Sequence, residues 1–242
     1  YRREYLCDFS ASTDDTLITI DIVSAAARRT VPGQTDYDGI AKVMGIDVAR
    51  FGHDKTVIAK RQGPLLHPLT QLEKRDNMTV ASMVARTADE WKPDAIFIDG
   101  GRGEGVIDRL RQLGYEVIEV NFGGTPSDAV HYANKRSEMW DLTRDWLDEG
   151  GMIPNDTTLK TDLCTPTYSF NASGQMVLEP KDKIKERLDR STDKGDALAL
   201  TFALPVRPKQ VNHEGKIPGR RTSAPVDYRL PWERKEYAHA RR

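Results

Sequence analysis

The sequence predicts an α/β fold in which helices flank a mixed β-sheet. Residues 42–61 hold two apolar runs on either side of a turn, as a β-hairpin does, and residues 65–72 can form a third strand beside it. Two later apolar runs, 95–98 and 115–120, alternate with segments of helical spacing. Strands that tight turns join pair antiparallel, and strands that helices join pair parallel. We therefore expect three antiparallel strands followed by parallel strands.

Helices are expected around these strands. Residues 79–91 have apolar side chains at helical spacing, and Lys92-Pro93 ends that helix. Further helices are expected over 16–29, capped by Thr13 or Asp14, and over 105–113, 135–149 and 194–204, with a charged helix or loop over 181–190. Two short strands are expected within 159–178, around the turn formers at 171–174. A mixed sheet with such helices is the ribonuclease-H-like pattern.

Composition excludes several classes of protein. Charged residues make up 30% of the chain, mean hydropathy is −0.60, and no run of about 18 apolar residues is present, so no membrane span is expected. The formal net charge of −1 gives no general attraction to nucleic acid, so any such contact must come from local patches. Cys7 and Cys164 lie far apart, which favours a reduced, intracellular compartment over a disulfide framework. Because the chain begins YRREY without an initiator methionine, we expect a fragment of a longer protein.

Three acidic residues stand at the ends of expected elements. Asp47 lies near the end of the first strand, Asp99 ends the fourth, and Asp196 begins the last helix. If the first and fourth strands are neighbours, Asp47 and Asp99 share one edge of the sheet, and the last helix can bring Asp196 opposite them. Each acid alone could be an ordinary turn or cap residue. Asp193 is either a fourth member of the group or a helix cap, and Asp54 is expected in the hairpin turn.

Clustered carboxylates need a compensating positive charge. Like charges a few ångströms apart raise one another's pKa, so such a group stays ionised only beside a cation. Oxygen-only ligands suit Mg²⁺ or Mn²⁺, and two such ions can stabilise the attacking and leaving oxygens of a phosphoryl displacement. We therefore expect Asp47, Asp99 and Asp196 to be catalytic and to bind divalent ions, with Asp193 as a further metal ligand.

Glycines follow Asp99 in the segment GGRGEG. This segment is similar to a dinucleotide-binding loop, but it lacks the regular Gly-x-Gly-x-x-Gly spacing and a second βαβ unit. A tight exit of the chain from Asp99 explains the glycines better. No P-loop pattern occurs, which excludes a self-contained ATPase of that kind, and neither a zinc spacing nor a Ser–His–Asp arrangement is evident.

Five segments together resemble the C-terminal nuclease domain of the large terminase subunit of tailed bacteriophages. They are YRREYLCDF, MGIDVARFGHDKT, FIDGGRGEGVIDRL, NKRSEMWDLTRDWLDEG and RSTDKGDALAL, and they span roughly residues 1–204 in the order of that family. The family closes this domain with a Ser-Pro-Asp-x-x-Asp-Ala segment. Here Thr192 stands in place of the proline, and both acids, Asp193 and Asp196, are kept.

The resemblance implies a ribonuclease-H-like nuclease that cuts concatemeric viral double-stranded DNA during genome packaging, with two Mg²⁺ or Mn²⁺ ions as cofactors. It implies that Asp47, Asp99 and Asp196 are the metal-binding acids, with Asp193 as a candidate fourth. It also implies an upstream packaging ATPase domain of the same polypeptide, and the portal protein and the small terminase subunit as partners. The expected location is the cytoplasm of the host cell.

Basic residues near the expected loops offer contacts to DNA. Lys135 and Arg136 end the loop at 121–136, and Lys181 and Lys183 follow the two short strands. All four could contact phosphates, with an affinity that falls with salt and is independent of base sequence. They could equally form a solvated face of the protein.

Three regions are expected along the chain. Residues 1–40 form either a linker or brace from the upstream ATPase domain or an ordinary N-terminal helix, and residues 41–204 form the nuclease domain. The tail at 205–242 has ten Lys and Arg against four Asp and Glu, and we expect it to be disordered in isolation.

Two other functions stay open. One is a non-catalytic module that docks on the portal through the basic tail. The other is an ATPase like actin or the sugar kinases, although Asp47 and the turn at Gly100-Gly101 are too close in sequence to leave room for a full first domain of that kind.

Overall fold

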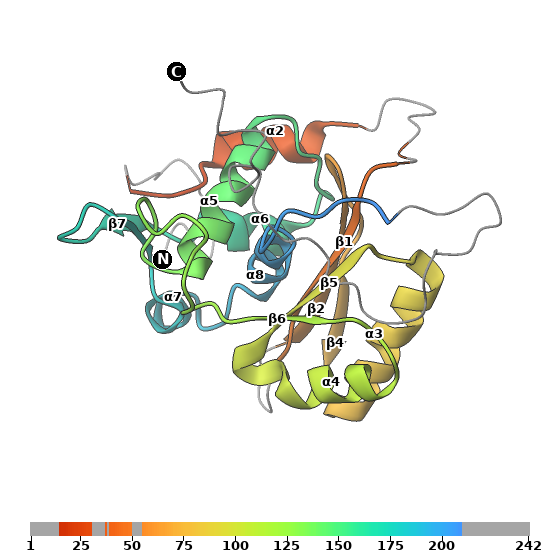
Figure 1. Cartoon of the computed structure of the whole chain (residues 1–242). Coiled ribbons are helices and arrows are strands. Elements are labelled where there is room, and N and C mark those ends of the chain that lie inside the picture. The colour runs from red at the N-terminus through yellow and green to blue at the C-terminus, as the bar shows by residue number, and fades with distance from the viewer. Residues whose placement is uncertain (1–14, 31–36, 38, 50–54, 210–242) are drawn as a thin grey trace, which may run out of the picture.

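The computed structural model describes residues 15–30, 37, 39–49 and 55–209, and a mixed β-sheet lies at its centre (Figure 1). The strands of this sheet are β1 (Lys42–Asp47), β2 (Lys55–Gln62), β3 (Leu65–Leu66), β4 (Thr70–Glu73), β5 (Ala95–Asp99) and β6 (Ile118–Val120). Their order is β3-β2-β1-β5-β6, and β4 also pairs with β2. A separate small sheet pairs β7 (Tyr168–Phe170) with β8 (Met176–Leu178).

The strand pairing confirms the predicted mixed sheet. β1 is antiparallel to β2, and β2 is antiparallel to both β3 and β4. β1 then pairs parallel with β5, and β5 pairs parallel with β6. The first and fourth predicted strands are therefore neighbours, as the argument for a shared edge requires.

Helices cover both faces of the sheet (Figure 1). One face is covered by α3 (Asn77–Trp91) and α4 (Gly100–Gln112), whose side chains share a core with Met44 and Ile46 of β1. The other face is covered by α8 (Asp193–Leu200), behind which lie α5 (Lys135–Asp148), α6 (Thr157–Cys164) and α2 (Ile20–Arg28). The helix α7 (Lys181–Leu188) links β8 to α8. Because successive residues of a strand point to opposite faces, β1 contributes side chains to the hydrophobic cores on both faces of the sheet.

Gly45 explains why α8 lies so close to β1. A Cβ atom at this position would stand 2.2 Å from the carbonyl oxygen of Ala197 and 3.0 Å from the Cβ of Leu200. Only glycine therefore allows the helix to rest on the strand. The residues of α8 from Lys194 to Leu200 are all buried, as expected of a helix that is covered on all sides.

The structure corrects the prediction for the segment at 159–178. Its first part belongs to α6, a helix, and only its later part forms the two predicted short strands, β7 and β8. Asp156 caps α6 by accepting a hydrogen bond from the backbone N–H of Leu159 at 3.0 Å. Leu159 and Leu163, one helical turn apart, are both buried. Their i,i+4 spacing carries the helical signal, but over only eight residues.

Other boundaries also differ from prediction. The third strand is divided into β3 and β4, and Pro68, which cannot donate to a strand ladder, lies between them. The helix α4 begins directly after β5, at Gly100 rather than at 105, because Asp99 serves as its N-cap. β6 is shorter than the predicted strand at 115–120, and α8 ends at Leu200.

The helix α2 is packed onto the sheet-bearing unit. Val23 and Ala26 are buried, and Arg29 donates hydrogen bonds from Nη1 to the carbonyl oxygens of Leu147 and Gly151, at 2.5 and 2.8 Å. Its N-cap is Thr19, whereas the expected caps at 13 and 14 lie outside the described residues. Among the helices that the structure describes, none has the length and apolar character needed to cross a membrane.

Candidate metal centre

Asp47 and Asp99 lie at the same edge and on the same face of the sheet. Ile46 pairs with Ile98 in the parallel register of β1 and β5, so the next residue of each strand is an acid. Phe97, two residues before Asp99, belongs to the core on the α8 side. The alternation of strand residues therefore turns both carboxylates toward α8. Asp47 is 5% exposed and Asp99 is 7% exposed.

Asp196 approaches this edge from the first turns of α8. Its Oδ1 accepts hydrogen bonds from Nε1 of Trp140 at 2.9 Å and from Nε of Arg136 at 3.2 Å. Its Oδ2 accepts one from Oγ1 of Thr192 at 3.1 Å. The residue is fully buried, with 0% exposure. Donors around a buried carboxylate favour its charged form and fix its orientation.

Lys181 stands between the acids. Its Nζ lies 3.1 Å from Oδ2 of Asp196 and 3.7 Å from Oδ1 of Asp47. The same ammonium group lies 4.4 Å from the ring centroid of Phe122, within the range of a cation–π contact. The ammonium group of Lys181 thus lies between a carboxylate of β1 and one of α8.

Asp193 lies on the first turn of α8 and connects that helix to β2. Its Oδ2 accepts a hydrogen bond from the backbone N–H of Lys55 at 2.9 Å. Its negative charge is close enough to raise the pKa of the Asp47 carboxyl. Asp54, which was expected in the turn before β2, lies outside the described residues.

Burial and mutual repulsion determine the charge of this group. Burial raises the pKa of the Asp47 carboxyl well above its usual value, and the neighbouring carboxylates add to this effect while Lys181 opposes it. Burial also raises the pKa of Asp99. For Asp196 burial is the largest cause and acts in the same direction, but Lys181, Arg136 and the hydrogen bond from Trp140 together outweigh it, so its pKa lies below the usual value. Lys181 therefore does not offset the effect of burial on the pKa of Asp47 and Asp99.

The chemistry of this group fits a divalent cation. Its donors are carboxylate oxygens, the ligands that Mg²⁺ and Mn²⁺ prefer. Asp47 and Asp196 are already drawn to one shared cation, the ammonium group of Lys181. In the described part of the chain, however, no three Asp, Glu, His or Cys side chains stand close enough together to form a ready metal cage. Lys181 contacts the carboxylate oxygens of Asp47 and Asp196 that an ion would need.

The structure places two of the predicted DNA contacts in the interior. Lys135 is 8% exposed, and its Nζ pairs with Glu138 at 2.6 Å. Arg136 is 7% exposed and donates to Asp196 and to the carbonyl oxygen of Glu179, at 3.2 and 2.6 Å. These internal partners speak against DNA contact by either side chain. A charged pair at the start of a helix looks the same in the sequence whether it faces solvent or the core.

The other two predicted contacts remain accessible to different degrees. The side chain of Lys181 is 35% exposed, but it belongs to the group of acids described above. Lys183, on the same helix α7, is exposed. Of the four basic residues, Lys183 is therefore the one whose placement favours contact with a phosphate.

Three further residues of this site have no signal in the sequence. Trp140 and Thr192 donate to Asp196, and Phe122 contacts Lys181. Trp140 is part of the apolar stripe of a predicted helix, where an indole that meets a carboxylate cannot be told from one that only packs. Phe122 lies in a predicted loop of turn formers, where no periodicity marks it. Only their contacts in the folded protein identify these residues, and the sequence does not reveal such contacts.

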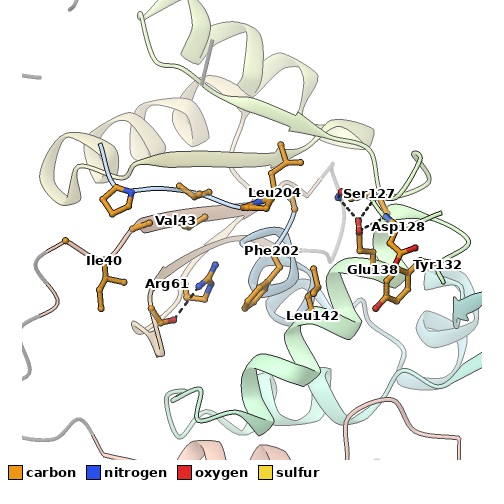
Figure 2. Close-up of a pocket in the computed structure, with 18 residues that line it drawn as sticks. Ile40, Val43, Arg61, Ser127, Asp128, Tyr132, Glu138, Leu142, Phe202 and Leu204 are labelled. Carbon is orange, nitrogen blue, oxygen red and sulfur yellow. Dashed lines mark hydrogen bonds and ion pairs between the residues drawn. The ribbon is translucent and has the colours of Figure 1, made fainter. Parts of the chain in front are cut away.

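A cavity of about 640 Å³ lies elsewhere, beside Val43, Arg61, Phe202 and Leu204 (Figure 2). Val43 is four residues before Asp47 on β1, so this cavity is at the opposite end of the strand, on the order of 13 Å away at the rise of a β-strand. None of the four acids lines it. This cavity and the candidate metal centre are therefore separate features.

Comparison with known proteins identifies the fold. The sheet order and the flanking helices define a ribonuclease-H-like α/β domain. More particularly, the chain has the fold of the nuclease domains of phage large terminases. The nuclease domain of the large terminase subunit gp2 of bacterial virus Sf6 matches with a TM-score of 0.65 and 19% identity, over 79% of this chain and 100% of that chain.

Two further solved structures support this result. The large terminase nuclease of thermophilic phage G20c matches with a TM-score of 0.57 and 15% identity, over 78% of this chain and 98% of that chain. The large terminase nuclease domain of Thermus phage P74-26 matches with a TM-score of 0.50 and 15% identity, over 67% and 78%. At such identities the likeness establishes the fold, and function must be argued from the site. No protein-family model matches the chain, and no curated protein matches its sequence significantly.

Proposed function

We propose that this chain is a divalent-metal-dependent endonuclease, the C-terminal part of a terminase large subunit that cuts concatemeric viral double-stranded DNA during genome packaging. One observation carries the proposal. Asp47 and Asp99, which are far apart in the sequence, lie at one edge and on one face of the sheet, and Lys181 links Asp47 to Asp196 of α8, in a fold that is shared with phage terminase nuclease domains. A group of buried carboxylates destabilises the fold unless a positive charge lies beside it, and such groups are typical of functional sites that bind cations.

The proposed cofactors are two Mg²⁺ or Mn²⁺ ions. Asp47, Asp99 and Asp196 would hold them, with Asp193 as a fourth ligand. Solved relatives of the same fold carry magnesium, cobalt or manganese, which supports a divalent ion here. When bound, such ions activate water and stabilise the attacking and leaving oxygens of a phosphodiester.

The residues of the chain itself would prepare the site. Trp140, Arg136 and Thr192 orient the Asp196 carboxylate, so that its direction is fixed before any ion arrives. Lys181 contacts both Asp47 and Asp196, and its ammonium group would have to leave these oxygens for an ion to reach them. Its partial exposure gives it a route to solvent or to a DNA phosphate.

The wider assignment follows from the same proposal. Residues 41–204 would be the nuclease domain, with α2 packed onto it. Residues 1–40 would lead from a packaging ATPase domain, and residues 205–242 would form a basic tail. Double-stranded DNA, the portal protein and the small terminase subunit would be its partners, in the cytoplasm of an infected host cell. Lys183 and Lys181 would contribute DNA contacts that do not depend on base sequence.

A plasmid assay tests the proposal. The purified chain should nick supercoiled plasmid with Mn²⁺ or Mg²⁺ and should fail with EDTA. Asp47→Ala should abolish nicking, whereas Asp89→Ala, which removes an exposed acid on α3, should leave the rate unchanged. Circular dichroism must show that both variants are folded. Cleavage by folded Asp47→Ala at the wild-type rate would exclude the assigned site, and a folded wild-type chain without any metal-dependent cleavage would favour a non-catalytic docking module.

A further inference from the structure

The first turn of α8 is capped from another helix. Thr192 occupies the N-cap position, yet its side chain accepts no capping hydrogen bond, and its hydroxyl donates to Asp196. The backbone N–H groups of Lys194 and Gly195 donate to Oδ2 of Asp162, at 3.0 and 3.4 Å. Asp162 lies on α6 and is fully buried, with 0% exposure. A carboxylate at a helix N-terminus satisfies free N–H groups and interacts favourably with the helix dipole.

Asp162 is itself held from the other side. Its Oδ1 accepts a hydrogen bond from Nη1 of Arg190 at 2.5 Å, and the same nitrogen donates to the carbonyl oxygen of Ser191 at 3.0 Å. Both oxygens of the buried carboxylate are therefore used, one on the segment before α8 and one on α8 itself. The carboxylate fixes the position of the helix start along its axis as well as its rotation.

Close packing leaves the helix start little freedom. A Cβ atom at Gly195 would stand 2.6 Å from Cη2 of Trp140 and 3.3 Å from Cβ of Asp162. Trp140 is the same residue that donates to Asp196. The start of α8 is thus enclosed between α5 and α6, and a small displacement of its first turn would move the carboxylate of Asp196 away from its partners.

We propose that Asp162 is a positioning residue for the candidate metal centre, a role that rests on the proposed nuclease function. It does not contact the ions or DNA. It sets the first turn of α8 so that Asp196 faces Lys181 and Asp47, and so that Asp193 reaches the backbone N–H of Lys55. Loss of this cap lowers the affinity of the site for metal, by roughly 10-fold or more, as for other outer residues that orient metal ligands.

Two variants of the same helix test this role. Asp162→Asn keeps the size of the side chain but presents an amide where both Arg190 and the helix N–H groups need an acceptor. Asp156→Asn is the matched control, because Asp156 lies just before α6 and binds the side chain of Lys194 at 2.5 Å but does not contact the N–H groups of α8. Both changes remove an ion pair beside Lys194, so a purely structural effect should appear in both.

Two readouts separate the outcomes. With Mn²⁺ titrated by calorimetry and by plasmid cleavage, Asp162→Asn should raise the Mn²⁺ midpoint roughly 10-fold or more while Asp156→Asn stays at the wild-type value. In the metal-free protein, hydrogen exchange at the amides of Lys194 and Gly195 should be faster in Asp162→Asn only. If Asp162→Asn does not fold, Arg190→Met, which frees one oxygen of Asp162, should shift both readouts in the same direction.

The remaining results have distinct meanings. A folded Asp162→Asn, or Arg190→Met in its place, with the wild-type Mn²⁺ midpoint and wild-type exchange would overturn the positioning role. Faster exchange in Asp162→Asn, together with a wild-type chain that neither binds Mn²⁺ nor cuts DNA, would overturn the nuclease function and retain Asp162 only as the cap of α8.

Discussion

Gly45→Ala tests the link between the packing of α8 and the chemistry of its acids. The added Cβ would stand 2.2 Å from the carbonyl oxygen of Ala197, whereas ordinary contact begins at 3.4 Å, so α8 must move by about 1 Å. The obstructing atom belongs to the backbone and cannot rotate away. Overpacking of this kind destabilises a fold by about 1–3 kcal/mol. Because Asp196 precedes Ala197 directly, a 1 Å displacement should also reduce the cleavage rate by about 100-fold.

Two assays and one control measure this effect. Urea denaturation gives the free energy of unfolding, and plasmid nicking at saturating Mn²⁺ gives the cleavage rate. Gly101→Ala is the control, because the nearest atom to its new Cβ is Oδ1 of Asp99 at 3.6 Å, an ordinary contact at the edge of the same site. We expect the control to keep both values. A Gly45→Ala chain with stability within about 0.5 kcal/mol of wild type and an unchanged rate would refute the claim that close packing of α8 on β1 positions Asp196.

The other predictions concern charge. Because burial raises the folded-state pKa of Asp47 above its unfolded value of 3.8, its stabilising contribution is full below that value and is lost as the pH rises through the folded pKa. Saturating Mn²⁺ should therefore raise the melting temperature more at about pH 8 than at about pH 5, and equal shifts at both pH values would contradict this. Lys181→Met should lower stability in EDTA, with the difference from wild type reduced by Mn²⁺; a loss that Mn²⁺ does not reduce would show that no ion replaces the lysine. Lys183→Ala should weaken DNA binding and reduce the slope of log affinity against log salt by about 1, whereas Lys135→Met should lower the melting temperature and leave that slope unchanged, as binding isotherms at several salt concentrations would reveal.

The sheet was predictable because its signals are local. The apolar runs that became β1, β2 and β5 are each bounded by turn formers or a helix. The pairing of β1 with β5, which the expectation of a shared edge assumed, is known only from the structure. Once that register is given, the alternation of strand residues places Asp47 and Asp99 on one face. The sequence therefore sufficed for the strands that end in Asp47 and Asp99 and for a helix that starts near Asp196, and not for their placement in space.

The remaining parts depend on contacts that no local pattern reveals. The bridge from Lys181 to two acids joins residues that are 134 and 15 positions apart. The burial of Lys135 follows from Glu138 and the backbone of the loop before it, and not from any apolar character. The helix α6 was not predicted because two leucines one turn apart are a weak helical signal in eight residues. The hydrogen bond by which Asp162 of α6 caps α8 could therefore not be predicted either.

Diffraction from a crystal soaked in Mn²⁺ tests the central claim most directly, because the anomalous signal locates the ions independently of the model of the protein. Our account predicts Mn²⁺ bound by the carboxylates of Asp47, Asp99 and Asp196, with the ammonium group of Lys181 displaced from between them. Saturating Mn²⁺ without an anomalous peak at these three side chains, or with peaks only elsewhere on the chain, would contradict it.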